Sequence, residues 1–263
     1  MLLRPAFPAF TDRLLACKGL ALAMRVVLAL LLWDGLSTAQ ADPGYYVVTV
    51  YDNSGQRGID LRYWTVRHPD SPQVIWPELG LSYGVNSRWY TELFASFIGS
   101  SQMATRLSTW NWQNDVLLTQ GEWPIDVAVH TNIARLADGD GAYAVEIGPV
   151  LQTDVERTQL NFNVFFERGH AGARPQETQL KYQWQARYRW RPPLNFGVQG
   201  FGEVGTWDNW APRDQQSHRA GPALFGTVPL GEHQALQWQG AYLFGSIYGS
   251  NGRMLTLRAL YTF

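Results

Sequence analysis

Cysteine is almost absent from this chain, which has 263 residues and a single cysteine, Cys17. Cys17 falls within residues 1–41, which we interpret below as a removable export segment, so the exported chain would hold no cysteine. Disulfides, thiol nucleophiles and cysteine-ligated metals are thereby excluded. We expect neither a metal nor a cofactor.

Charge is scarce as well. Charged residues make up 16% of the chain, and 21 Lys and Arg are balanced by 22 Asp and Glu. A chain with this balance has no basic footprint for nucleic acid. Its 46% content of hydrophobic residues is also too high for a disordered chain, and its length fits one domain.

Long apolar runs are missing too. Residues 26–33 form a short apolar stretch behind a basic residue, and a small-residue cleavage motif follows at residues 39–41. A membrane helix needs about 20 apolar residues, whereas Asp34 ends this stretch early. Because these parts together make a secretory signal, we expect a signal peptide at residues 1–41, with Met24 as an alternative start.

The chain does show a regular alternation of apolar and polar residues. Within residues 178–190, the even positions from 180 onward carry apolar side chains and the odd positions carry polar ones, and residues 159–167 largely repeat the pattern. Successive side chains of a strand point to opposite faces, so each such segment has one apolar and one polar face. Twelve such segments occur, at residues 57–66, 73–83, 88–98, 108–118, 124–134, 142–151, 157–168, 178–190, 193–206, 217–229, 235–246 and 253–263.

The connections between these segments alternate in length. Tight turns are expected at residues 84–87, 119–123, 152–156, 191–193 and 230–234, and longer loops include residues 99–107, 169–177 and 207–216. Strands of about 10 residues with short turns at one end and longer loops at the other are typical of outer-membrane barrels. The sequence therefore predicts an all-β fold, a single transmembrane antiparallel β-barrel of about 12 strands over residues 57–263. We expect it in the bacterial outer membrane with both termini periplasmic.

A soluble β-sandwich also alternates, but two features favour the barrel. The polar faces carry Asn, Gln, Arg and Glu over whole strands, which suits a wet lumen. Aromatic residues also gather near segment ends, as in the girdles of membrane interfaces. They are Tyr83, Trp89, Trp190 and Tyr261 near the turns, and Trp110, Tyr143 and Trp207 near the loops.

The two ends of the exported chain differ. Residues 42–56 contain a Tyr- and Val-rich stretch outside the twelve segments, which is a periplasmic extension, a plug inside the barrel or a β element at its rim.

The last segment ends on Tyr261 and Phe263, like the C-terminal signal that the outer-membrane insertion machinery reads. Arg258 stands where that signal usually has glycine. We expect this machinery and outer-membrane lipid as partners.

Alternation assigns most charged side chains of the segments to the lumen. Strands that follow one another in the chain are neighbours in the barrel wall. An arc of acidic side chains from the earlier strands and an arc of basic side chains from the later strands would therefore face each other across the lumen. They would give either an electric field across a narrow pore or an ion-pair network that closes it. We favour a pore, since a barrel of about eight strands is just filled and this one is wider. The acidic residues are Glu78, Glu92, Asp115, Asp126, Glu146 and Glu167; the basic ones are Lys181, Arg187, Arg189, Arg219 and Arg258; His130 and Glu203 add further polar groups.

Catalytic signals are weak. His130 alone among the histidines has polar company on its own segment, from Asp126 and Asn132, but no serine partner or Gly-x-Ser-x-Gly elbow accompanies it. Residues 138–141 suggest a calcium loop, yet the glutamate that should close such a loop is missing. We therefore expect no catalytic residues and a plain turn at residues 138–141.

Two hairpins resemble a known family. Residues 77–97 contain a strand, a Tyr-Gly-x-x-x-Arg turn and a returning strand, and residues 221–243 have a similar character. They resemble a family of outer-membrane proteins named for the meta-cleavage pathway of phenol degradation, over about residues 74–263. The resemblance implies a channel or transport role for small solutes, including aromatic ones, and carries over no functional residues.

The sequence thus predicts a porin-like channel for passive passage of small polar or aromatic solutes. The solute itself is not named by any motif. Two alternatives stay open: a membrane-embedded lipid-modifying hydrolase, and a structural or adhesive barrel with a closed lumen.

Overall fold

A computed structural model describes residues 45–50, 54–69, 71–137, 142–170 and 176–263. The expected signal peptide and the expected turn at residues 138–141 lie outside these ranges. Within them, no helix is long and apolar enough to cross a membrane.

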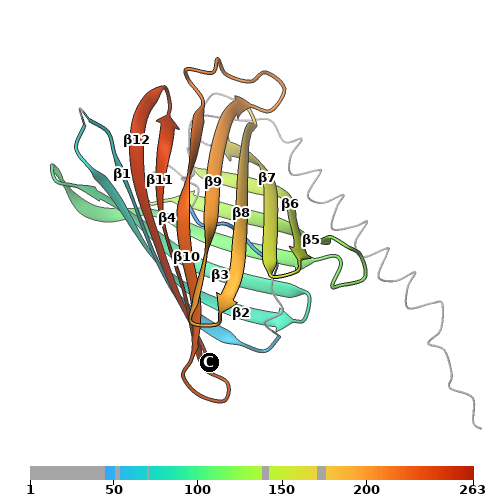
Figure 1. Ribbon diagram of the computed structural model, residues 1–263. Coiled ribbons are helices and arrows are strands. Elements are labelled where there is room, and N and C mark those ends of the chain that lie inside the picture. Colours follow the sequence, from blue (N-terminus) through green and yellow to red (C-terminus); the bar gives the residue numbers. More distant parts are fainter. Residues whose placement is uncertain (1–44, 51–53, 70, 138–141, 171–175) are drawn as a thin grey trace, which may run out of the picture. The chain divides into compact units, whose positions relative to one another are not determined.

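Twelve antiparallel strands close into one barrel, which confirms the predicted fold class (Figure 1). Each strand pairs with its neighbour along the chain, and β1 pairs with β12 over ten residues to close the sheet. The strands are β1 (Arg57–Arg67), β2 (Val74–Asn86), β3 (Trp89–Ser100), β4 (Met103–Leu117), β5 (Asp126–Leu136), β6 (Tyr143–Val155), β7 (Thr158–His170), β8 (Gln179–Arg191), β9 (Leu194–Thr206), β10 (Ser217–Pro229), β11 (Ala235–Ile247) and β12 (Ser250–Thr262).

Alternation in the sequence becomes alternation in burial. Along β12, residues 252, 254, 256, 258, 260 and 262 are buried, while Leu255 and Leu257 are exposed on the outer face. The outer face of the barrel is broadly apolar, as lipid contact requires. Its exposed side chains include Leu61, Leu81, Leu93, Trp112, Phe162, Leu224 and Phe244.

The two ends of the barrel are distinct. Arg57 and Phe263 exchange backbone hydrogen bonds of 2.9 and 3.1 Å, so β1 starts where β12 ends. We call this end the turn end, because three of its five connections, which join β2 to β3, β6 to β7 and β8 to β9, are two-residue turns, against two of the six connections at the other end. The opposite loop end carries, among others, the ten-residue connection 207–216 between β9 and β10.

Two connection lengths were predicted wrongly. Residues 99–107 were expected as a long loop, but β3 and β4 run on to a two-residue turn, with register shifts at Ser96/Phe97 and Ile98/Ser100. The glycine and serines there have loop composition, yet the facing strand satisfies their backbone groups. Conversely, the turn expected at residues 119–123 belongs to an eight-residue connection, 118–125.

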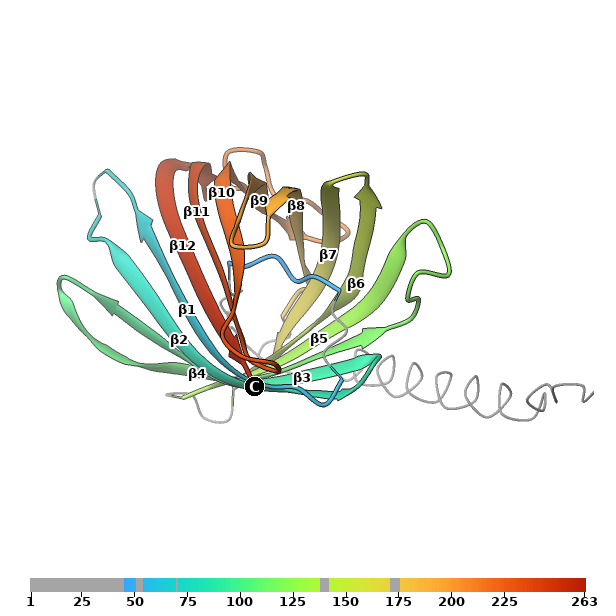
Figure 2. The same cartoon turned by 60° about the horizontal axis from the view of Figure 1, so that its bottom comes forward.

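A short segment that is not part of the wall lies inside the barrel. Residues 45–50, here the lumen segment, cross the interior (Figure 2). Their backbone is bound by wall side chains rather than by a strand: the Val48 amide donates to Gln183 (3.1 Å), and Asn163 donates to the Val48 carbonyl (2.8 Å). Residues 45–48 are buried.

Candidate transport lumen

The lumen segment runs from the loop end to the turn end. Tyr45 contacts Glu203 and Arg219, which lie in the loop-end halves of β9 and β10. The Val50 amide donates to Gln152 (3.3 Å), near the turn between β6 and β7. The segment thus spans the middle of the lumen lengthwise.

Tyr46 is held between two cations of the wall. The guanidinium carbon of Arg62 lies 3.9 Å from the Tyr46 ring centroid, and that of Arg258 lies 4.8 Å away. The Tyr46 hydroxyl donates to the side-chain oxygen of Gln113. A desolvated cation over an aromatic face is worth about 2 kcal/mol, so this ring is a main anchor of the segment.

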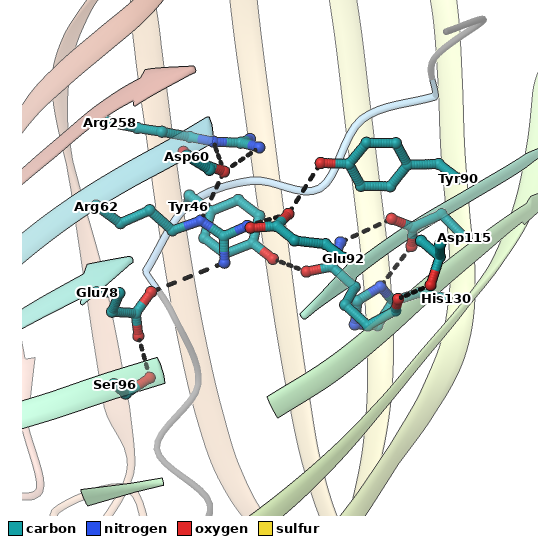
Figure 3. Close-up of polar contacts among 12 residues, drawn as sticks. Tyr46, Asp60, Arg62, Glu78, Tyr90, Glu92, Ser96, Asp115, His130 and Arg258 are labelled. Carbon is teal, nitrogen blue, oxygen red and sulfur yellow. Dashed lines mark hydrogen bonds and ion pairs between the residues drawn. The ribbon is translucent and has the colours of Figure 1, made fainter. Parts of the chain in front are cut away.

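Arg62 joins carboxylates from three strands (Figure 3). Its guanidinium lies 2.9 Å from Asp60 on β1, 3.7 Å from Glu78 on β2 and 2.6 Å from Glu92 on β3. Asp60 also binds Arg258 on β12, at 2.7 Å. All five side chains are buried, and such buried charges are stable only when they are paired in this way.

A second set of charges continues along the wall from the Tyr46 hydroxyl. Gln113 donates to Asp115 (2.7 Å), and Asp115 contacts Nδ1 of His130 (2.6 Å). Nε2 of His130 lies 3.4 Å from Glu146, which lies 3.4 Å from Lys181. Lys181 also binds Glu167. The chain of contacts therefore passes from β4 through β5, β6 and β8 to β7.

Tyr45 anchors the loop-end part of the lumen segment. Its hydroxyl donates to Glu203 (2.7 Å) and accepts from Arg219 (3.0 Å), and Arg219 also binds Glu203 at 2.5 Å. The Tyr45 ring meets Trp64 edge-on, with centroids 4.7 Å apart. Tyr248, from the turn between β11 and β12, donates to the other oxygen of Glu203. One carboxylate thus joins the segment, the wall and a loop-end turn.

The structure divides the charges assigned to the lumen by their burial. Most are buried, but Asp126, Arg187 and Arg189 are half-buried toward the turn end. Asp126 accepts from the Gly121 amide (2.6 Å), and Arg189 binds Asp154 (2.8 Å). The buried ones are Glu78, Glu92, Asp115, Glu146, Glu167, Lys181, Glu203, Arg219 and Arg258, together with His130.

Opposite charges meet locally rather than across an open space. Lys181 on β8 reaches Glu146 and Glu167, and Arg62 on β1 reaches Glu78 and Glu92. Each of these two basic side chains thereby joins two acidic side chains from other strands.

His130 has no nitrogen left for a hydroxyl nucleophile. Both ring nitrogens face carboxylates, Asp115 and Glu146, and its ring lies 4.7 Å from that of Phe165. A general base needs a nitrogen within reach of the proton it removes. Among the described residues, no group of three His, Cys, Asp or Glu side chains could hold a metal ion.

The C-terminal aromatic residues face outward. Tyr261 and Phe263 stack with centroids 5.5 Å apart, and Phe263 is 44% exposed at the turn end. Their side chains lie beside the seam between β1 and β12, where Tyr261 pairs with Ile59.

Apolar lumen residues were missed by the sequence reasoning. Phe165 and Phe225 are almost fully buried and pack, in separate clusters, with Val48 and Val47 of the lumen segment. Phe165 stands at an odd position of the segment 159–167, where the other odd positions are polar. That exception in the alternation was the available signal.

Two cavities flank the lumen segment. A cavity of about 540 Å³ lies on the loop-end side and is lined by Tyr45, Trp76, Lys181, Arg219 and Tyr248, among others. A smaller one of about 50 Å³ lies beside Thr49, with Arg187 and Arg258 in its wall.

Solved structures share this fold, although their sequences differ widely from this one. No protein-family model and no curated protein matches the chain. The crystal structure of an outer membrane channel from Pseudomonas putida F1 has a TM-score of 0.57 and 13% identity, covering 85% of this chain and 100% of that one. A NanC porin has a TM-score of 0.52 and 11% identity, covering 78% of this chain and 98% of that one. In fold, this chain is an outer-membrane β-barrel.

Proposed function

We propose that this protein is an outer-membrane channel for small polar or aromatic solutes, closed in the described state by its own lumen segment. A barrel of about eight strands fills its interior with wall side chains, so a twelve-stranded one has room for a separate filler. The observation that carries the proposal is the burial of residues 45–48 between opposite walls.

The attachment of the lumen segment supports a removable closure. Its backbone binds side-chain amides of Asn163, Gln183 and Gln152 and takes part in no strand pairing. Leaving the lumen would therefore break contacts with side chains but no part of the barrel ladder. The fold would remain closed as a sheet while the interior opened.

The charges and aromatic rings around the segment would select the solutes. Lumen-facing cations and carboxylates screen permeants by charge, and Trp64, Trp76 and Tyr45 offer ring faces at the loop-end cavity. A small solute with polar groups or an aromatic ring fits such a lining better than a large apolar one.

Single-channel currents in a planar bilayer test the proposal. The refolded exported chain should conduct rarely or in small steps, and a variant lacking residues 42–50 should give larger, stable steps. A variant with a shortened 230–234 turn, which is exposed and lines neither cavity, is the control and should behave like the parent. Silence from the folded, inserted 42–50 deletion would overturn the channel function, because the remaining side chains would then fill the lumen.

A further inference from the structure

Two arginines lie directly opposite each other on the outer face of the barrel. Arg67 ends β1, Arg253 stands near the start of β12, and the two are in register across the seam at the loop end. Figure 1 and Figure 2 both show β1 beside β12. Both side chains are exposed, and neither has a carboxylate partner among the described residues. Like charges in directly opposed positions destabilise a strand pair.

The same two strands carry a second pair of opposed arginines. Arg62 and Arg258 are also directly opposite, but on the inner face. There Asp60 lies between them, 2.9 Å from Arg62 and 2.7 Å from Arg258. The inner pair is thus neutralised by the protein itself, whereas the described part of the chain supplies no anion to the outer pair.

The surface below the outer pair is apolar. Toward the turn end, the next pairs on the same face of the seam are Thr65 with Leu255, Tyr63 with Leu257 and Leu61 with Ala259; Thr65 itself is buried. Leu61 is 54% exposed and Leu257 is 47% exposed. An anion that reaches both guanidinium groups would therefore have an apolar surface directly beneath it.

We propose that Arg67 and Arg253 bind a phosphate of lipid A, the membrane anchor of lipopolysaccharide. Arginine matches phosphate through two parallel hydrogen bonds, and two opposed guanidinium groups can share one dianionic group. The acyl chains would lie along Leu61, Leu255 and Leu257. The proposal rests on the outer-membrane placement, with the loop end in the outer leaflet, but not on conduction.

Binding can be measured directly with diphosphoryl lipid A as the probe. Native mass spectrometry of the refolded exported chain should show lipid A adducts that the double variant Arg67→Gln/Arg253→Gln weakens at least tenfold. Arg57→Gln is the matched control, since Arg57 is an exposed arginine at the other end of β1, and it should bind like the parent. Equal binding by parent and double variant, or equal binding of dephosphorylated lipid A, would overturn the proposal. Displacement of lipid A by millimolar inorganic phosphate would also overturn it, as the pair would then be an unspecific anion site.

A stability measurement in two kinds of vesicle distinguishes a lipid A site from a purely structural pair. In phosphatidylcholine vesicles, Arg253→Gln removes repulsion and should raise the urea midpoint of unfolding or leave it unchanged. In vesicles that contain lipid A, the same variant should have the lower midpoint. The same effect of the substitution in both vesicles would contradict a lipid A site. Neither experiment depends on currents, so a silent channel would leave this result standing.

Discussion

The guanidinium carbon of Arg62 lies 3.9 Å from the ring centroid of Tyr46, so one cation serves both the barrel wall and the segment that fills it. On its other sides Arg62 binds Asp60 and Glu92, at 2.9 and 2.6 Å. The anchoring of Tyr46 and the neutralisation of Asp60, Glu78 and Glu92 therefore depend on the same side chain.

Tyr46→Ala should open the channel more often. The substitution removes the ring between Arg62 and Arg258 and the hydrogen bond to Gln113. Loss of about 1.4 kcal/mol from the closed state would raise the open-to-closed ratio about tenfold. Bilayer currents measure this ratio, with Tyr83→Ala on the outer face as the control. Equal open times in Tyr46→Ala and the parent would show that the ring does not hold the segment.

Arg62→Met should destabilise the barrel strongly. Glu78 and Glu92 would remain buried without their cation, which costs about 3–5 kcal/mol. Urea unfolding in lipid vesicles, followed by tryptophan fluorescence, measures the loss. Arg88→Met is the control, because Arg88 binds Glu122 at 2.8 Å in an exposed pair. The expectation fails if both variants shift the urea midpoint equally.

Reversing the charge at Arg187 and Arg189 should make the opened channel more cation-selective. Arg187 lines the cavity beside Thr49, and Arg189 lies half-buried at the turn end. Two positive charges replaced by two negative ones in the ion path favour cations. The reversal potential under a salt gradient, recorded in the background lacking residues 42–50, should move toward the cation value. Arg57→Glu, at an exposed, outward-facing position at the turn end of β1, should leave the potential nearly unchanged.

His130→Gln should not change the rate of lipid hydrolysis relative to the parent. Both His130 nitrogens face carboxylates, so the ring is not placed to activate a nucleophile. A fluorogenic phospholipid ester assay on refolded protein should show background hydrolysis for both proteins. Hydrolysis by the parent that vanishes in a folded His130→Gln variant would restore the hydrolase alternative.

The strands could be predicted because alternation is a local property. The predicted segment 178–190 differs by one residue at each end from β8, Gln179–Arg191. The segment 217–229 coincides with β10, Ser217–Pro229. In each strand the apolar face must meet lipid, so apolar residues recur at every second position of the sequence.

Composition was a poorer guide to the connections. Gly99 and Ser100 look like loop residues, yet they belong to β3, because Val74 and Ile75 of β2 are in register with them. Whether a glycine or serine lies in a loop or a strand depends on a partner strand that its own neighbours in sequence do not reveal.

The sequence by itself determined the strand count, the two faces of each strand and the common end of β1 and β12. Only the tertiary structure decided how the lumen is filled: that Lys181 reaches Glu146 two strands away, that Asp60 bridges Arg62 and Arg258, and that residues 45–50 lie inside. The physical reason is that these contacts join residues distant in the chain. They form only when β1 meets β12 and the closed wall sets both the register and the space that remains inside.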